Sequence, residues 1–174
     1  MIAMALACDP NLLIADEPTT ALDASIQMDI LDLIMDLVDE RNMALIIISH
    51  DLGVIARTTT RMAVMYAGRF VETGDTTRLL SAMAHPYSQA LYRALPQHPE
   101  LSDGPAHQRS RLPIIPGSVP SPFSPIEGCA FSNRCRHAET DCFQQQPSLD
   151  DIAPAHAVAC HHPQGSGPLP EAVH

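Results

Sequence analysis

A pair of acidic residues and a histidine follow apolar runs near the start of the chain. Asp16 and Glu17 come directly after the run 11–15, and His50 comes shortly after the run 43–48. If both runs are parallel strands, their carboxyl ends meet at one sheet edge, where α/β folds bind ligands. An aspartate there can hold Mg²⁺, and an adjacent glutamate can accept a proton from an attacking water. The pattern predicts phosphoryl transfer, although an acidic pair alone is more simply a solvated strand end.

Four of the five cysteines lie close together in the sequence, with the spacing C-x5-C-x6-C-x17-C. Four thiolates in one loop region can ligate an iron–sulfur cluster or a structural zinc ion. Zinc sites usually pair cysteines about two to four residues apart, and this spacing contains no such pair. Disulfides are disfavoured in a cytosolic protein. An iron–sulfur cluster, a zinc ion and no metal at all stay open for these four residues, which are Cys129, Cys135, Cys142 and Cys160.

The other cysteine and the nearby histidines have simpler interpretations. Cys8 lies in an apolar, helix-prone stretch and is predicted to be a small core residue. Arg134 and Arg136 flank Cys135, where they could offset the negative charge of a cluster or be solvated. Four histidines could substitute as metal ligands, but we expect exposed loop residues: His137, His156, His161 and His162.

A strand, a helix and a second strand must position the acidic edge. The runs 11–15 and 43–48 are short and apolar except for Asn11, which is typical of strands buried on both faces of a parallel sheet. Between residues 24 and 40 apolar side chains recur at helical spacing, and the interleaved aspartates mark the face we expect to be wet. This order predicts a right-handed crossover. The run 1–7 is expected to be the tail of a longer helix, because it begins without a capping residue.

The rest of the chain is predicted to form a hairpin, a broken helix and a proline-rich region. Residues 62–66 and 70–72 are two β runs around a tight turn at Gly68. A helix is expected from residue 76 to about 95, broken near Pro86. Because 14 of the 16 prolines fall from Pro86 onward, we expect an extended linker to about residue 125.

Composition narrows the possible functions. The chain has 174 residues with a formal net charge of −10, so a nucleic-acid partner is not expected. All 10 basic residues are arginines, so no phosphate-loop lysine is present. The apolar runs are far shorter than the roughly 20 residues of a membrane-spanning helix. We expect a cytosolic protein.

Two motifs resemble the nucleotide-binding subunits of ABC transporters. The string LLIADEPTTALD, residues 12–23, resembles a Walker B segment and D-loop, and LIIISHD, residues 45–51, resembles the segment with the switch histidine. The resemblance implies a water-mediated Mg²⁺ contact for Asp16 and a general base in Glu17. It further implies communication across a subunit dimer for Asp23 and a γ-phosphate sensor in His50.

A later segment resembles one group within these transporters. The string HPYSQALYRALP, residues 85–96, looks like a segment of importers for dipeptides, oligopeptides and nickel, as do LPIIPGSVPSP and the cysteine region. The resemblance covers residues 1–163, and some members of the group carry a 4Fe-4S cluster on four comparable cysteines. The cofactors implied are ATP, Mg²⁺ and a 4Fe-4S cluster.

The predicted fold class is α/β. We expect the carboxy-terminal part of a P-loop ABC nucleotide-binding domain, a parallel sheet with flanking helices, plus a proline-rich region with four cysteines. The Walker A loop and the signature motif have no counterpart in the sequence, so we expect a fragment that is inactive alone. The expected domains are a partial ATPase core (1–84), a helix and proline-rich linker (85–127), the four-cysteine region (128–163) and a disordered tail (164–174).

The function implied is ATP hydrolysis that energises the import of dipeptides or oligopeptides. The implied partners are a second ATPase subunit, transmembrane permease subunits and, indirectly, a periplasmic or extracellular solute-binding protein. The implied location is the cytoplasmic face of the cytoplasmic membrane. Two alternatives stay open: an iron–sulfur or zinc module without ATPase activity, and a fragment of an SMC-like ATPase.

Overall fold

The computed structural model describes residues 2–20, 22–95, 114–121, 123 and 125–165. The chain forms two compact units, residues 1–59 and 60–174. The hairpin that follows the histidine segment therefore lies in the same unit as the four cysteines. Most of the expected linker and nearly all of the expected tail fall outside the described residues.

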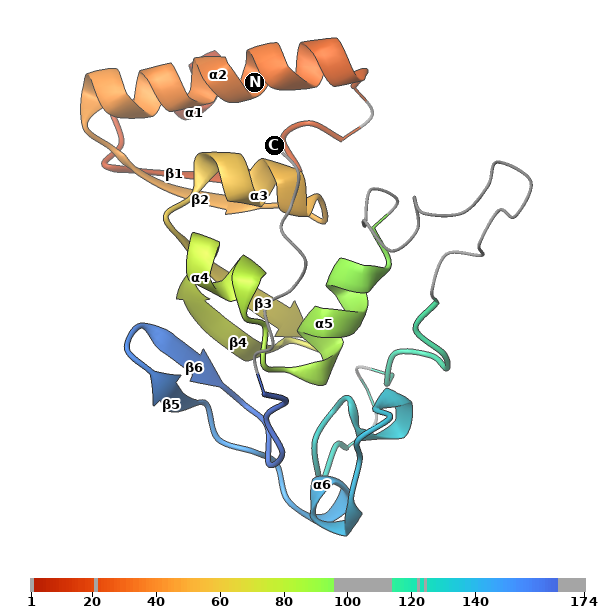
Figure 1. The fold of residues 1–174 in the computed structure, drawn as a ribbon. Coiled ribbons are helices and arrows are strands. Elements are labelled where there is room, and N and C mark those ends of the chain that lie inside the picture. The colour runs from red at the N-terminus through yellow and green to blue at the C-terminus, as the bar shows by residue number, and fades with distance from the viewer. Residues whose placement is uncertain (1, 21, 96–113, 122, 124, 166–174) are drawn as a thin grey trace, which may run out of the picture. The chain divides into compact units, whose positions relative to one another are not determined.

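The first unit is a two-stranded parallel sheet with a crossover helix (Figure 1). Strand β1 (Leu12–Asp16) pairs in parallel with β2 (Ala44–Ile48), and α2 (Ala24–Arg41) connects them. This confirms the predicted strand, helix and strand. The first helix, α1 (Ile2–Ala5), is short, and α3 (Leu52–Thr58) follows β2.

The core of this unit lies between one face of the sheet and α2. It contains Leu6, Leu13, Ile34, Val38 and Met43. The prediction that both strands are buried on both faces is wrong for this unit, because no described element of it covers the second face. Three isoleucines there are about half exposed or more, at 60, 48 and 49%: Ile14, Ile46 and Ile48.

Aspartates begin both longer helices of the first unit. Asp23 Oδ1 accepts a hydrogen bond from Ile26 N at 3.0 Å, which caps α2. Asp51 Oδ1 accepts from Gly53 N at 2.8 Å and caps α3. A carboxylate at this position satisfies a backbone N–H that has no partner within the helix. The two caps therefore determine the residues at which α2 and α3 begin.

The second unit is built on an antiparallel hairpin. Strand β3 (Arg61–Tyr66) pairs with β4 (Arg69–Asp75) around a turn in which Ala67 and Gly68 both have positive φ, 47° and 77°. Two positive φ angles are typical of a type I′ hairpin turn. The prediction of a tight glycine turn is confirmed.

Two short helices follow the hairpin. They are α4 (Thr76–Ser81) and α5 (Pro86–Arg93). The predicted break near Pro86 is confirmed, because Pro86 occupies the first turn of α5, where its missing N–H is tolerated. Tyr66, Tyr87 and Phe131 pack their rings together at 4.6–5.4 Å, which joins β3, α5 and the cysteine region.

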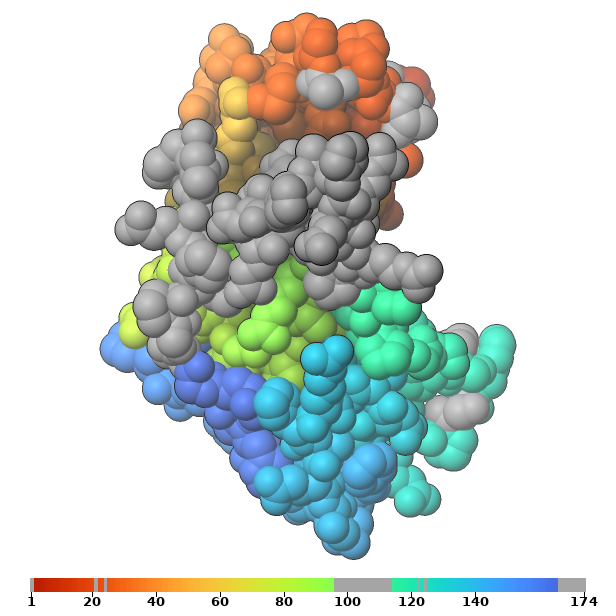
Figure 2. Space-filling view, turned by 45° about the vertical axis from the view of Figure 1, so that its right-hand side comes forward, coloured from red at the N-terminus to blue at the C-terminus, as the bar shows by residue number. Residues whose placement is uncertain are grey.

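A second hairpin extends the first one and was not predicted. Strands β5 (Asp150–Ala153) and β6 (His156–Val158) complete an antiparallel sheet in the order β3-β4-β6-β5. Both strands are too short to show a period in the sequence. A 3₁₀ turn (Ser132–Arg134) and α6 (Thr140–Gln144) complete the cysteine region, which lies beside this hairpin in Figure 2. Among the described residues no helix has the length and apolar character needed to cross a membrane.

Candidate functional site

The acidic edge of the first unit brings Glu17 and His50 into contact. Glu17 Oε1 lies 3.0 Å from His50 Nδ1. Thr20 Oγ1 donates to the other carboxylate oxygen at 2.9 Å. Glu17 N donates to Ile48 O at 2.9 Å, so the backbone ladder between the strands continues into the site. Thr20 was not predicted as a site residue. Its position three residues after Glu17 could have indicated a contact between the two side chains.

The Glu17–His50 contact favours opposite charges on its two members. The His50 hydrogen bond, followed by that of Thr20, lowers the pKa of Glu17. The same hydrogen bond and the negative charge of Glu17 raise the pKa of His50. The side chain of His50 is 79% exposed and that of Glu17 is 37% exposed, so solvent screens this attraction. A carboxylate held this way can accept a proton from a bound water.

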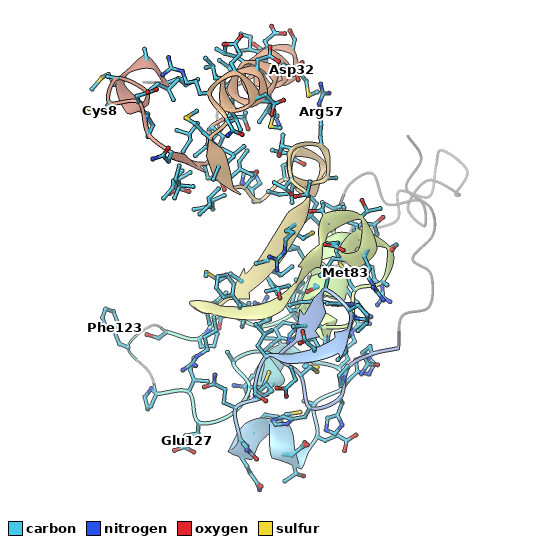
Figure 3. The ribbon with its side chains drawn as sticks, turned by 90° about the vertical axis from the view of Figure 1, so that its left-hand side faces the viewer. Cys8, Asp32, Arg57, Met83, Phe123 and Glu127 are labelled. Carbon is cyan, nitrogen blue, oxygen red and sulfur yellow. The ribbon has the colours of Figure 1, made fainter. Side chains whose placement is uncertain are left out.

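The other two predicted site residues, Asp16 and Asp23, lie at the end of β1 and at the start of α2. Asp16 is exposed at the end of β1, where it is paired in register with Ile48. Asp23 serves as the cap of α2, a local role that the sequence interpretation did not include. The interleaved aspartates of α2 are exposed as expected, and Asp32 forms a 2.8 Å ion pair with Arg57 of α3 (Figure 3).

The four cysteines of the second unit meet at one pocket. Cys129, Cys135, Cys142 and Cys160 all line it. Three of them are half-buried and Cys142 is buried. Residues from the flanking elements complete the lining, among them His85, Phe131, His137, His161 and His162.

Close backbone contacts hold the cysteines around this pocket. Cys129 N donates to Cys142 O at 2.7 Å, and Cys135 N donates to Ser132 O at 3.2 Å. Gly128 makes the first contact possible, since a Cβ there would lie 2.6 Å from Phe143 C and would overlap Cys142 O. Apart from the glycine itself, no sequence pattern indicates this close approach.

Burial disfavours the thiolate form of three of the four pocket cysteines. Burial raises the pKa of Cys129 and Cys135, and it raises that of Cys160 to about 11. Backbone N–H groups act in the opposite direction, and that of His137 donates to Cys135 Sγ at 3.4 Å. Such donors stabilise thiolates. A bound metal must therefore displace protons from these thiols.

The distances between possible ligand atoms indicate where a single metal ion could be bound. Within the described residues, the only group with all ligand atoms inside 4.8 Å of one another is Asp141, Cys142 and His162. A tetrahedral zinc ion bound to four thiolates would hold their sulfurs about 3.8 Å apart, given a Zn–S bond of about 2.3 Å. The four cysteine sulfurs do not form such a group, so they are not gathered as a single zinc ion would hold them.

Two expectations about single residues are wrong. Cys8 is exposed rather than buried in a core, and it lies after α1 (Figure 3). Arg134, for which two interpretations were open, is half-buried, and its guanidinium donates to Ile115 O at 2.9 Å and to Pro116 O at 2.7 Å. His156 is 4% exposed rather than an exposed loop residue, since β6 turns it into the unit.

A buried glutamate connects the second hairpin to the residues before α5. Glu72 of β4 is 0% exposed. Glu72 Oε1 lies 2.8 Å from His156 Nε2 and accepts from Ala84 N at 2.6 Å. Glu72 Oε2 accepts from His85 N at 3.2 Å. Sequence analysis missed this network, because its members are more than ten residues apart and only the fold brings them together.

Comparison with known proteins gives a consistent result. Residues 71–142 match the family described as "Oligopeptide/dipeptide transporter, C-terminal region". The chain is 52% identical over 160 residues to a "Probable peptide ABC transporter ATP-binding protein" of Sinorhizobium fredii, which covers 92% of this chain and 46% of the relative.

Two dipeptide transport ATP-binding proteins named DppD are similar as well. That of Escherichia coli is 45% identical over 163 residues, or 94% of this chain and 48% of the relative. That of Haemophilus influenzae is also 45% identical over 163 residues, with 94% and 47% covered. The chain spans about half the length of the curated relatives it matches. Neither an SMC-like ATPase fragment nor a metal module without an ATPase role is supported.

Proposed function

This chain belongs to the family of peptide ABC transporter ATP-binding proteins, and we propose that it contributes to ATP hydrolysis that drives the import of dipeptides or oligopeptides. The observation that carries the proposal is the contact between Glu17 and His50 at the sheet edge, 3.0 Å long. The names of the relatives support the choice of peptides as the solute.

The chemistry follows from the residues at this edge. Glu17 accepts the proton of the attacking water, while Thr20 and His50 hold its carboxylate in place. His50 then contacts the γ-phosphate of ATP from the neighbouring strand. Asp16 would hold Mg²⁺, which would supply positive charge beside the phosphates. Asp23 caps α2, and we propose that it also takes part in communication with a second ATPase subunit. The phosphate-binding loop is not among these 174 residues.

A chimeric subunit tests this function. The matched part of the Escherichia coli dipeptide transport protein is replaced by residues 1–163 of this chain, and dipeptide uptake is measured in cells that lack the native subunit. We expect uptake to be restored, and we expect Glu17→Gln in the chimera to abolish it. Restored uptake that survives Glu17→Gln would contradict the assignment of the general base.

We also propose that the four cysteines hold a 4Fe-4S cluster. The support is their position around one pocket, in which their sulfurs are not gathered as a single zinc ion would hold them. Cys129, Cys135, Cys142 and Cys160 would each ligate one iron, and the cluster would supply a centre for one-electron chemistry or a rigid crosslink. A zinc ion at Asp141, Cys142 and His162 is the second candidate.

Metal analysis distinguishes the two candidates. The chain is purified without oxygen, and iron, sulfide and zinc are measured together with the visible absorbance. We expect nearly equal iron and sulfide in the wild type and their loss in Cys135→Ser. Cys8→Ser is the matched control, because Cys8 is exposed and lies in the other unit. Stoichiometric zinc without sulfide would refute the cluster.

The remaining assignments concern the intact transporter. We infer a second ATPase subunit and membrane permease subunits as direct partners, with a solute-binding protein as an indirect one. The corresponding location is the cytoplasmic face of the membrane, reached through the permease. We further propose four functional segments. They are a partial ATPase core (1–84), a helix and proline-rich linker (85–127), the four-cysteine region (128–163) and a tail (164–174).

A further inference from the structure

His85, at the start of the HPY segment, is a buried histidine with a defined tautomer. Its ring is 1% exposed, and His85 Nδ1 accepts a hydrogen bond from Tyr87 N at 3.0 Å, which caps α5. A ring nitrogen that accepts a hydrogen bond carries no proton. The proton of the neutral ring therefore lies on Nε2. Burial lowers the pKa of His85 to about 4, so the ring is neutral at physiological pH.

The N–H group of His85 Nε2 has no hydrogen-bond partner among the described residues. A buried donor without an acceptor costs about 1–3 kcal/mol, and such groups in native proteins call for an explanation such as an ion or a redox role. Ser88 Oγ is also buried without a partner, but Ser88 does not line the cysteine pocket. His85 does line it, together with all four cysteines.

Contacts with Glu72 and Phe131 hold His85 in position. His85 N and Ala84 N both donate to the buried carboxylate of Glu72, at 3.2 and 2.6 Å. The ring packs against Phe131, with the two centroids 6.0 Å apart. Phe131 lies between Cys129 and Cys135 in the sequence. The structure therefore holds a buried histidine with an unpaired Nε2 at the wall of a pocket that the four cysteines also line.

We propose that His85 Nε2–H donates a hydrogen bond to a sulfur atom of the metal group held by the four cysteines, and that this bond raises the group's reduction potential. The inference rests on the proposed cysteine-bound metal centre. An N–H···S bond stabilises the more negative, reduced state, and hydrogen bonds to sulfur are one of the means by which proteins set cluster potentials. His85 is a positioning and tuning residue, not a ligand.

Two substitutions separate the roles of the two ring nitrogens. Asparagine is a good helix cap, so His85→Asn keeps an acceptor near Nδ1 and removes the donor at Nε2. Glutamine reaches further, so His85→Gln places an amide N–H near the position of Nε2 and gives up the cap. Ser88→Ala is the control, because it changes a buried unpaired group on the same helix that lies outside the pocket.

The measurement is an anaerobic reductive titration of the intact chain, followed by visible absorbance and electron paramagnetic resonance. We expect His85→Asn to shift the one-electron reduction equilibrium about tenfold toward the oxidised state, which is about 59 mV. His85→Gln should recover part of this shift, and Ser88→Ala should leave the potential unchanged. Equal potentials in the wild type and His85→Asn, with equal cluster content, would overturn the proposal.

Failure of the cluster and failure of the hydrogen bond give different results. If the wild type holds zinc, the iron–sulfur proposal fails, and the hydrogen bond is tested in the chain loaded with cadmium-113. A scalar coupling between the His85 Nε2 proton and cadmium supports the N–H···S bond, and its absence overturns it. A chain that binds no metal overturns both proposals.

Discussion

The two candidate sites of this chain are held in place in different ways. In the first unit, Glu17 and His50 meet in solvent, with side chains 37 and 79% exposed. In the second unit, His85 lines the cysteine pocket and donates through its backbone N–H to Glu72, and the two residues are 1 and 0% exposed. The first site depends on two strand ends and a surface contact, whereas the second is fixed by buried hydrogen bonds. Substitutions of site residues should therefore change the stability of the first unit little and that of the second unit more.

The largest effect is expected from Glu17→Gln in the chimeric subunit. Loss of a general base typically slows a reaction by 10²–10⁴-fold, so ATP hydrolysis should fall by about 100-fold or more. Because Glu17 is at the surface of its unit, the melting temperature should change little. ATP hydrolysis and thermal unfolding are measured on the same samples. Asp32→Asn, which removes the exposed pair with Arg57, is the control and should retain activity.

The second largest effect is expected from Glu72→Gln. The amide cannot accept from Ala84 N, His85 N and His156 at once, so at least one buried donor loses its partner. Removing one member of a buried charged network costs about 3–5 kcal/mol. Urea unfolding of the chain should show a loss of about 4 kcal/mol. Glu40→Gln, at an exposed position of α2, should stay within about 0.5 kcal/mol of the wild type. Equal stabilities would show that the network contributes nothing.

The difference between the units also explains what the sequence could predict. The crossover of β1, α2 and β2 and the β3–β4 hairpin were predictable, because periodicity and a glycine turn are local signals. The exposure of Ile14, Ile46 and Ile48 was not predictable, because burial depends on which elements cover a face.

In the second site, too, features formed by neighbouring residues were predictable and contacts between distant residues were not. The four cysteines were visible as a spacing, but the Glu72–His156 contact links residues 84 positions apart. The cap formed by His85 is local, yet its unpaired Nε2 appears only when the pocket is folded. Residue types predicted the chemistry, and tertiary contacts determined which residues could take part in it.

A smaller effect is expected in the pH dependence of stability. The pKa of His85 is about 4 in the folded chain and about 6.5 when unfolded. Because the unfolded chain takes up this proton first, stability is lost as pH falls from about 6.5 to about 4. The loss due to His85 is at most about 3 kcal/mol, from 1.36 kcal/mol per pKa unit. Unfolding of the wild type and His85→Gln is compared at several pH values. The difference between them should be constant above pH 7 and should change below it, and a constant difference throughout would exclude the effect.

The smallest effect is expected in the pKa of His50, which forms an exposed pair with Glu17. Contact with Glu17 raises the pKa of His50 above its ordinary value of 6.5, and contact with His50 lowers the pKa of Glu17 below 4.5. The attraction is complete below pH 6.5 on the histidine side and is lost as pH rises through the raised pKa. On the glutamate side it is present above pH 4.5 and is lost as pH falls through the lowered pKa.

Glu17→Gln should return the pKa of His50 toward 6.5, as measured by NMR titration of the ring. Asp32→Asn should leave this pKa unchanged, because Asp32 pairs with Arg57 instead. Since both members of the pair are exposed, the global stability of the chain should not follow the titration. A His50 pKa that is the same in the wild type and Glu17→Gln would mean that solvent screens the contact completely. In that case the general base would have to be held by Thr20 alone until ATP binds.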